Sequence, residues 1–477
     1  MVTKIKADIC VIGAGSGGLS VAAGAAQLGA RTVLVERGEM GGDCLNSGCV
    51  PSKALIAAAK HAYDMMDGER FGIARVKPKI DFAKVNAHVR GVIKAIAPND
   101  SVERFEGLGV TVIKGDAHFR DRRSLMVGTT EIRARRFVVA TGSRAAIPPL
   151  TGLDTVPYLT NETIFDLTEC PAHLIIIGGG PIGMEMAQAH RRLGAKVTVI
   201  DAAIPLAKDD PELTAIVIDQ LMREGVDILE STRIASVAGD ETLAGQIGAI
   251  SVTLENGDVI QGSHLLVAAG RAPSVLGLGL EKADVQYSRY GINVDDSLKT
   301  SNRRIYAIGD VIGGLQFTHV AGYHAGLVIR SALFRIPAKV DYANIPWVTF
   351  TDPEIAHVGE TEEQARAHYK KINVLRWQFA ENDRAQTMRQ TEGHIKIITD
   401  MHSRILGCTI VGPEAGELIL PWVLAKSRGI KLSTMAGLVA PYPTLSEVSK
   451  RVAGSYYTPT LFSARTRALV RFLRIFG

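Results

Sequence analysis

A glycine-rich turn between an apolar run and a run of small residues constrains the fold of this 477-residue chain more than any other feature. Residues 8–12 form a short, largely apolar segment of strand type, and the alanine-rich stretch after the turn is typical of a helix that ends near Leu28. The turn carries the pattern GxGxxG in Gly13, Gly15 and Gly18. Such a segment predicts the opening of a βαβ unit that binds a dinucleotide. The first glycine permits the tight turn, the second lets the backbone approach a pyrophosphate, and the third lets helix and strand pack closely.

A carboxylate at the end of the next strand supports this prediction. Residues 31–35 are of strand type and lead to Glu36, which lies 18 residues after Gly18. At that distance an acidic side chain meets a ribose hydroxyl. GxGxxG alone is weak evidence, and the alternative is a glycine-rich packing turn in another kind of α/β unit. The order of strand, helix and acid favours the dinucleotide.

The same pattern returns 165 residues later. A strand predicted over residues 173–177 precedes the second turn, and a strand over residues 196–200 ends at Asp201. The glycines of this turn are Gly178, Gly180 and Gly183. Two units indicate two dinucleotides, a flavin dinucleotide and the nicotinamide dinucleotide that reduces it. The Asp201 carboxylate accepts from a 2′-hydroxyl and repels a 2′-phosphate, and no Arg or Lys follows before Lys208, so we expect NAD rather than NADP.

Two cysteines, Cys44 and Cys49, lie five positions apart between these units. In a regular helix this spacing points the side chains apart, so a disulfide between them needs a distorted turn, which Gly48 can supply. Pro51 suits a first helical turn, and a helix predicted over residues 52–66 places Cys49 at a helix N-terminus, where the dipole stabilises a thiolate. The alternatives are two buried free thiols, or a metal site that lacks further Cys or His ligands nearby. We favour a reducible disulfide that acts as a two-electron relay.

Residues 41–53, GGDCLNSGCVPSK, closely resemble the redox-active motif of the class I pyridine nucleotide–disulfide oxidoreductases. Mercuric reductase, dihydrolipoyl dehydrogenase and glutathione reductase belong to that family. The resemblance runs nearly end to end and includes residues 140–143 (ATGS), 269–273 (AGRAP), 306–310 (YAIGD), 351–354 (TDPE) and 442–447 (YPTLSE). It implies an α/β fold with two Rossmann-like dinucleotide-binding domains, one for FAD and one for NAD, and a C-terminal α+β dimerisation domain.

The resemblance also implies boundaries and site residues. The FAD domain is split into residues 1–150 and 272–343, the NAD domain covers residues 151–271, and an interface domain over residues 344–477 builds a homodimer. Lys53 is implied to lie at the flavin and to pair with Glu185. The residues expected at FAD are Gly13, Gly15, Gly18, Glu36, Gly42, Lys53, Gly115, Thr141, Gly142, Ser143, Asp310 (at the ribityl chain), Gln316, Phe317, Thr318 and His319. Those expected at NAD are Gly178, Gly180, Gly183, Glu185, Asp201, Gly270 and Arg271.

Tyr442 departs from the pattern of two family members. Dihydrolipoyl dehydrogenase and glutathione reductase begin this motif with a His that pairs with the Glu five residues on, here Glu447, and shuttles protons during thiol–disulfide exchange. Histidine titrates near neutral pH, whereas the ordinary pKa of tyrosine is about 10, and a general base works best with a pKa near the working pH. We therefore expect slow exchange with lipoamide or glutathione. The candidate catalytic residues are Cys44, Cys49, Lys53, Glu185, Tyr442 and Glu447.

Tyrosine at this position makes the chain similar to mercuric reductase. A soft metal ion held by thiolates does not need the same proton shuttle. Mercuric reductase also passes metal inward through a Cys pair near its C-terminus, but residues 455–477 contain no cysteine, which argues against efficient mercury reduction. The other three cysteines, Cys10, Cys170 and Cys408, are interpreted as buried or incidental thiols, and we expect no resident metal.

Composition excludes several classes of protein. Charged residues make up 22% and hydrophobic residues 46% of the chain, which is an ordinary globular balance. The net charge of +5 is too small to indicate a nucleic-acid partner. The sequence shows no signal-peptide pattern and no convincing membrane span, so we expect a cytoplasmic protein.

Residues 463–477 have an unusual pattern of four arginines, no acid and interleaved large apolar residues. We favour a terminal helix that packs on the interface domain with its arginines in solvent. The alternative is a basic amphipathic helix for a membrane surface or a partner.

The sequence as a whole predicts a homodimeric FAD enzyme that uses NADH to reduce the Cys44–Cys49 disulfide and, through it, a thiol-bound metal ion or a disulfide-type small molecule, as in mercuric reductase. Dihydrolipoyl dehydrogenase is the runner-up, favoured by Asp201 and opposed by Tyr442. A quinone or dye reductase is a further alternative. A non-catalytic, flavin-bound partner protein is the last alternative. The cysteine pair argues against it, because a protein without catalytic activity does not need a redox relay.

Overall fold

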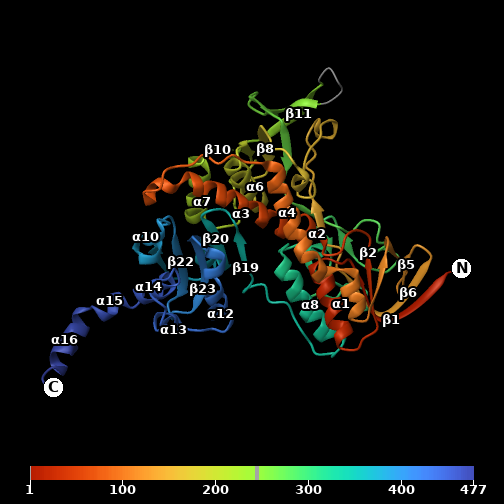
Figure 1. Cartoon of the computed structure of the whole chain (residues 1–477). Helices are drawn as coiled ribbons and strands as arrows, with labels where there is room; N and C mark the ends of the chain where they lie inside the picture. The colour runs from red at the N-terminus through yellow and green to blue at the C-terminus, as the bar shows by residue number, and fades with distance from the viewer. Residues whose placement is uncertain (1, 242–246) are drawn as a thin grey trace. The chain divides into compact units, whose positions relative to one another are not determined.

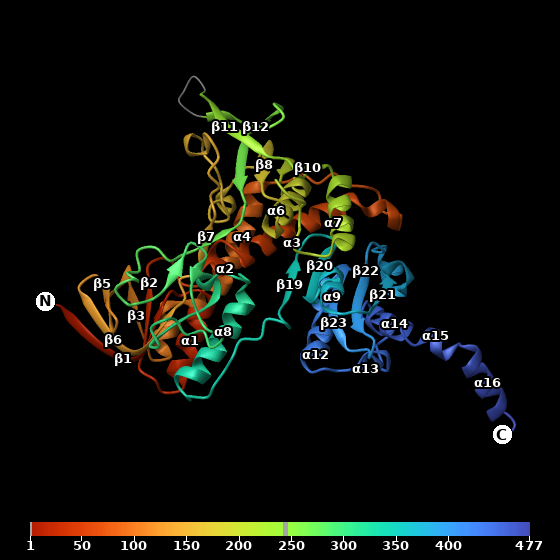
Figure 2. The ribbon, with the colours of Figure 1, turned by 180° about the vertical axis from the view of Figure 1, so that it is seen from behind.

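A computed structural model of the chain describes residues 2–241 and 247–477 and divides it into two compact units (Figures 1 and 2). Unit 1 comprises Met1–Asp67, Arg75–Ala202 and Leu229–Val340. Unit 2 comprises Gly68–Ala74, Ala203–Ile228 and Asp341–Gly477. Each unit has a hydrophobic core of its own and is described by itself.

A seven-stranded sheet in the order β3-β2-β1-β6-β5-β4, with β18 also paired to β6, is the largest sheet of unit 1. Its strands are β1 (Thr3–Ile12), β2 (Thr32–Glu36), β3 (Val110–Lys114), β4 (Ala117–Asp121), β5 (Ser124–Val127), β6 (Thr130–Val139) and β18 (Ile305–Ala307). The first βαβ unit is β1, α1 (Ser16–Gln27) and β2, and both strands run parallel. α1 packs beside α8 (Thr318–Ala332), and the fully buried Ile9, Val11 and Leu34 belong to the same core as these two helices.

The second βαβ unit is also present in unit 1. β8 (His173–Ile177), α6 (Pro181–Arg192) and β9 (Lys196–Ile200) follow one another, and the parallel sheet runs β9-β8-β14, with β14 at His264–Val267. The bounds of β8 and β9 coincide with the predicted strands, because each is a short, largely apolar segment that ends at a glycine turn or an acid. The prediction of an α/β fold with two such units is confirmed.

Helical segments lie between the two βαβ units along the chain. α2 (Gly42–Asn46) leads into α3 (Cys49–Met66), which packs against α4 (Phe82–Ile96) and α6. The remaining α-helix and strands of unit 1 are α5 (Val102–Gly107), β7 (Ser143–Ala145), β11 (Ile234–Glu241), β12 (Ile247–Leu254), β13 (Val259–Gly262), β15 (Arg271–Pro273), β16 (Tyr287–Ser288) and β17 (Gly291–Ile292), while β10 (Val226–Leu229) falls where unit 2 passes into unit 1 along the chain.

Unit 2 is built on a five-stranded antiparallel sheet in the order β19-β20-β23-β22-β21. Its strands are β19 (Pro346–Thr349), β20 (Glu354–Gly359), β21 (Ile372–Gln378), β22 (His394–Asp400) and β23 (Ile405–Gly412). Its helices are α7 (Pro211–Arg223), α9 (Glu362–His368), α10 (Asp383–Met388), α11 (Ala415–Leu418), α12 (Leu420–Ser427), α13 (Leu432–Ala436), α14 (Glu447–Ser455), α15 (Thr458–Leu461) and α16 (Ala464–Leu473). α7 lies against β20 and β23, although its residues fall within the range that the sequence assigned to the NAD domain.

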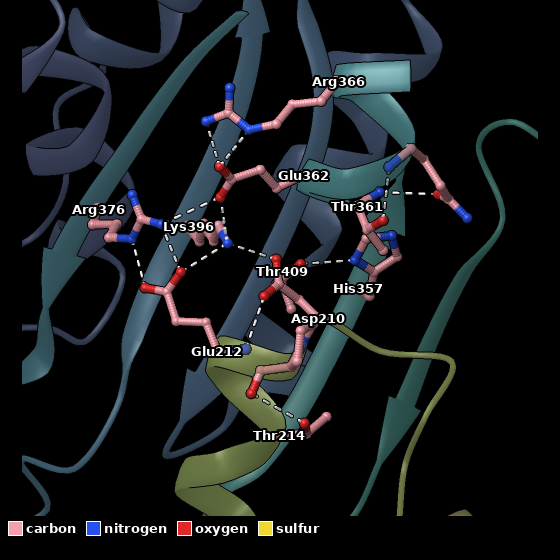
Figure 3. Close-up of polar contacts among 12 residues, drawn as sticks. Asp210, Glu212, Thr214, His357, Thr361, Glu362, Arg366, Arg376, Lys396 and Thr409 are labelled. Atoms are coloured by element: carbon pink, nitrogen blue, oxygen red, sulfur yellow. Dashed lines mark hydrogen bonds and ion pairs between the residues drawn. The ribbon is translucent and has the colours of Figure 1, made fainter. Parts of the chain in front are cut away.

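A buried lysine ties α7 to this sheet (Figure 3). Lys396 on β22 is 3% exposed, and its ammonium donates to Asp210 Oδ2 at 2.7 Å and to Glu212 Oε2 at 2.8 Å. It also lies 2.8 Å from Glu362 Oε2. Burial alone would lower the pKa of Lys396, but the three carboxylates outweigh it and the net pKa is raised. The Arg376 guanidinium, with help from Lys396, lowers the pKa of Glu212 to about 2.

The expected packing of the last helix on the interface domain is not seen. After α14 the chain turns away from the sheet, so that α15 and α16 project from it in both views (Figures 1 and 2). No residue of α16 is buried. Its large apolar residues are therefore exposed in this protomer.

In the described ranges 2–241 and 247–477, no helix is both long and apolar enough to cross a bilayer.

Candidate active site

Two glycine turns in unit 1 form cradles that a side chain would fill. Gly13 has φ +104°, and a Cβ there would lie 2.4 Å from the carbonyl oxygen of Ala140. A Cβ on Gly18 would lie 1.8 Å from the carbonyl oxygen of Gly13, so the close approach of α1 to β1 requires glycine. α1 begins without a side-chain cap, which leaves its first N–H groups to a phosphate. Gly178 and Gly183 repeat this geometry at the start of α6. Both turns therefore fit a dinucleotide.

The acids at the ends of β2 and β9 occupy equivalent positions. Glu36 accepts hydrogen bonds from the N–H of Ala14 at 2.6 Å and of Gly38 at 2.7 Å. Asp201 accepts from the N–H of Gly179 at 2.6 Å. Each carboxylate thus holds the glycine turn of its own unit and lies where a ribose is expected. The sequence predicted the ribose contact but not this support of the turn.

The two cysteines lie together, one in α2 and the other at the first residue of α3. Both are free thiols, Cys44 partly buried and Cys49 exposed, and the two side chains are hydrogen-bonded. The hydrogen bond from Cys44, with smaller effects of Thr318 and Lys53, lowers the pKa of Cys49 to about 6. The same interaction raises the pKa of Cys44. Cys49 is thus a thiolate at neutral pH while Cys44 keeps its proton.

Polar contacts that the sequence did not reveal hold the cysteine loop. Asp43 Oδ1 accepts from Ser47 Oγ at 2.9 Å and from the buried Asn161 amide at 2.8 Å, and Asn161 also donates to the Ser47 carbonyl at 3.3 Å. Arg271 lies 3.0 Å from the other oxygen of Asp43. Asn161 and Arg271 are far from the loop in sequence, so only the fold brings them together.

Lys53 on α3 and Glu185 on α6 form an ion pair. Lys53 Nζ donates to Glu185 Oε2 at 2.7 Å, and the Glu185 side chain is only 6% exposed. The packing of α3 against α6 brings the two residues together although 132 positions separate them. Lys53 is one turn after Cys49, and its charge contributes to the low pKa of that thiol.

Asp310 lies in a second polar group of unit 1. Ser143 Oγ donates to Asp310 Oδ2 at 2.6 Å, and Arg271 Nε donates to Ser143 Oγ at 2.7 Å. Burial raises the pKa of Asp310, and the contacts with Ser143 and Arg271 partly offset it. Arg271, expected from the sequence at NAD, therefore lies among residues expected at FAD.

The other residues expected at the cofactors also belong to unit 1, in loops and at the starts of helices. Thr141 Oγ1 donates to the Ser274 carbonyl at 2.8 Å. A Cβ on Gly42 would lie 2.7 Å from the Cα of Gly15, which brings the cysteine loop against the first glycine turn. Phe317 and His319 are stacked with ring centroids 5.3 Å apart. Gly115, Gly142 and Gly270 have positive φ, and Gln316 is partly buried.

Tyr442 lies in unit 2 and is 71% exposed. Its hydroxyl donates to Asp383 Oδ2 at 2.9 Å, and this carboxylate raises the pKa of the tyrosine. Glu447, the usual partner of the family His, begins α14 and raises the pKa of Tyr442 slightly further. Tyr442 is therefore a hydrogen-bond donor that keeps its proton at neutral pH.

The other cysteines stand apart from the pair. Cys10 and Cys408 are fully buried, which raises the pKa of both thiols, and Cys170 is partly buried. Among the residues that the structure describes, no three His, Cys, Asp or Glu side chains are grouped so as to hold a metal ion.

Two dinucleotide cradles and a thiolate–thiol pair define a dinucleotide-dependent disulfide oxidoreductase. Residues 7–325 match the family model described as pyridine nucleotide-disulphide oxidoreductase, and residues 345–453 match the dimerisation domain of the same family. The chain therefore belongs to this family. It is an FAD-dependent enzyme with a pyridine nucleotide as electron donor, and the second match supports a homodimer.

Three known proteins illustrate the likeness. Mercuric reductase of Lysinibacillus sphaericus is 32% identical over 95% of this chain and 83% of its own length. Dihydrolipoyl dehydrogenase of Geobacillus stearothermophilus is 34% identical over 94% of this chain and 96% of its own. The Cu(II) complex of the HOCl-induced flavoprotein disulfide reductase RclA from Escherichia coli superposes with a TM-score of 0.84 at 28% identity, covering 94% of this chain and 99% of that one.

The Thr318 hydroxyl is expected to help keep Cys49 ionised, since its oxygen lies 3.6 Å from Cys49 Sγ. Thr318→Val removes a donor to the thiolate, so the pH midpoint for Cys49 ionisation should move upward from about 6, by roughly one pH unit. The midpoint is measured from the pH dependence of iodoacetamide alkylation of the Cys49 peptide. Thr318→Ser keeps the hydroxyl and should leave the midpoint in place. An unchanged midpoint in the valine variant would contradict this role.

Proposed function

We propose that this enzyme passes electrons from NADH through Cys44 and Cys49 to a metal ion bound by thiolates, with Hg(II) and Cu(II) as the acceptors to test. The proposal rests on the hydrogen bond that Tyr442 donates to Asp383 and on the raised pKa of its hydroxyl. A tyrosine that donates to Asp383 and whose pKa is raised cannot replace a histidine as a proton shuttle. An acceptor that binds directly to thiolates does not need one. The likeness to mercuric reductase and to a Cu(II)-binding disulfide reductase supports the same acceptor class.

The chain's own residues have distinct roles in this proposal. The turns at Gly13 and Gly178, with Glu36 and Asp201, would hold FAD and NAD. When bound, FAD would supply hydride-accepting chemistry at the nicotinamide and two electrons for the disulfide form of the cysteine pair, which would return it to the thiol and thiolate. Cys49 supplies a thiolate at neutral pH, and Lys53, held by Glu185, supplies a fixed positive charge one helical turn away.

Cys44 is the proposed acceptor-facing thiol. It loses its proton to solvent when a soft cation binds, since the cation replaces the proton on sulfur. Two electrons from one NADH reduce one Hg(II) to the metal or two Cu(II) to Cu(I). We place the enzyme in the cytoplasm, where cellular reductants keep such thiols reduced.

Dihydrolipoyl dehydrogenase activity is the second candidate. Its specific support is the 34% identity to the Geobacillus stearothermophilus enzyme over nearly the full length of both chains, together with Asp201, which suits NAD. In this case a dihydrolipoyl thiol would exchange with the Cys44–Cys49 disulfide. That exchange needs a proton acceptor at the position of Tyr442.

A panel of acceptors tests the two candidates directly. Steady-state NADH oxidation is measured with Hg(II), Cu(II), lipoamide, glutathione disulfide and a quinone, and repeated with NADPH. We expect the metal ions to be the better acceptors and NADH the better donor, because the Asp201 carboxylate repels a 2′-phosphate. Tyr442→His should raise lipoamide turnover by about 10²-fold, the usual contribution of a positioned base, and Tyr442→Phe should not. Fast lipoamide turnover by the unmodified enzyme would overturn the metal-ion proposal.

A further inference from the structure

α16 carries a continuous apolar face in solvent. Leu469, Phe472, Leu473 and Phe476 are spaced i, i+3, i+4 and i+7, which places them on one side of the helix. Each of these side chains is more than half exposed. The rings of Phe472 and Phe476 meet edge to face with centroids 5.3 Å apart, so the face continues past the last helical residue.

The opposite side of α16 carries three arginines. Arg467, Arg471 and Arg474 follow the spacing i, i+4 and i+7 on the side away from the phenylalanines. Residues 448–477 contain no Asp or Glu, so no acid within this segment neutralises them. A helix with one apolar face and one arginine face suits a boundary between hydrocarbon and negative charge.

The position of α16 leaves this face open. α15 and α16 project beyond the sheet of unit 2 in both views (Figures 1 and 2), and no residue of either helix is buried. The match to the family's dimerisation domain ends at residue 453, so both helices lie beyond the matched residues.

We propose that α16 docks the enzyme on an anionic phospholipid surface. The apolar face enters the boundary between headgroups and acyl chains, and the three arginines of the other face lie among the lipid phosphates. We choose an anionic lipid surface because the arginines of α16 attract negative charge, and no acid in residues 448–477 offsets them. The enzyme then reduces its acceptor at the membrane surface.

Vesicle flotation of the full-length, FAD-loaded enzyme tests this docking. The vesicles are phosphatidylcholine alone or phosphatidylcholine mixed with phosphatidylglycerol. We expect flotation only with the anionic mixture and a loss of binding as salt rises. The triple variant Leu469→Gln, Phe472→Gln, Phe476→Gln should no longer float. Replacing Arg467, Arg471 and Arg474 with glutamine should weaken binding on the order of 10²-fold, from about five-fold per arginine.

A matched variant separates local charge from net charge. Arg122, Arg289 and Arg303 are exposed arginines of unit 1, and replacing all three with glutamine removes the same charge but should leave flotation unchanged. NADH oxidation in solution should be equal in all of these variants. Absence of flotation with anionic vesicles, or flotation that survives the triple apolar change, overturns the proposal. If the wild type stays in solution and the apolar variant instead turns dimers into monomers by light scattering, α16 belongs to a contact between copies.

Discussion

Cys49→Ser is expected to abolish the reduction of every acceptor that takes electrons from the cysteine pair. Cys49 is the thiolate of the pair, and serine at the same position does not ionise at neutral pH. We expect the NADH-dependent rate to fall by at least about 10³-fold, the scale seen when a reacting nucleophile is removed. The rate is measured at saturating NADH with the best acceptor of the panel, and Cys170→Ser, which changes a partly buried thiol elsewhere, should leave it unaltered.

The low pKa of Cys49 also predicts how the rate of acceptor reduction changes with pH. The pKa of Cys49 is lowered to about 6, so the thiolate predominates above that pH and is lost as pH falls through it. The wild-type rate should therefore fall with acidification through pH 6. Cys44→Ser should also stop acceptor reduction but should keep Cys49 open to alkylation at neutral pH. Substantial acceptor reduction by Cys49→Ser would show that electrons leave by a route other than the cysteine pair.

The parts of the site that could be predicted are those encoded by local pattern. β8 and β9 begin and end at the predicted residues because each is a largely apolar segment rich in β-branched residues that ends at a glycine or an acid. The start of α3 at Cys49 follows from Gly48 and Pro51 on either side of it. The two glycine turns were predictable because only glycine allows the close approach of helix and strand.

The parts that could not be predicted depend on contacts across the fold. Asn161 supports the cysteine loop from more than a hundred positions away, and nothing in its local sequence marks it. The contacts of Arg271 with Asp43 and Ser143 were not predicted, because they depend on the pairing of β15 with β7. The tail helix was expected to pack on its own domain. The sequence shows that this helix has an apolar face and a basic face, but it does not show which surface covers the apolar face.

The buried lysine of unit 2 is a further contact that no sequence pattern marks, and Lys396→Met is expected to destabilise that unit strongly. Asp210 and Glu212 lie at the start of α7 and Glu362 at the start of α9, so one ammonium joins two helix ends to β22 (Figure 3). Removing it leaves the buried Asp210 carboxylate without its cation, whereas Arg376 still pairs with Glu212 and Glu362. Breaking a buried ion pair from one side costs about 3–5 kcal/mol, and we expect the lower end because Glu212 and Glu362 are partly exposed.

Tryptophan fluorescence reports on this unit alone, because the chain's three tryptophans are Trp347, Trp377 and Trp422. Urea unfolding of wild type and variant is compared at one protein concentration, since dimer formation contributes to stability. Arg366→Ala is the matched control. Arg366 is 60% exposed and contacts Glu362 in the same cluster, so its loss should cost less than about 1 kcal/mol.

A second change distinguishes lost charge balance from lost packing. Adding Asp210→Asn to Lys396→Met removes one unpaired charge but keeps an N-cap side chain for α7, where Asp210 accepts from the Glu212 N–H at 3.1 Å. The double variant should regain part of the lost stability. Because the pKa of Glu212 is lowered to about 2, its contribution to wild-type stability holds above its ordinary pKa and is lost as pH falls toward 2. Equal stability of wild type and Lys396→Met would mean that packing of α7 on β20 and β23 holds the unit together without this charge.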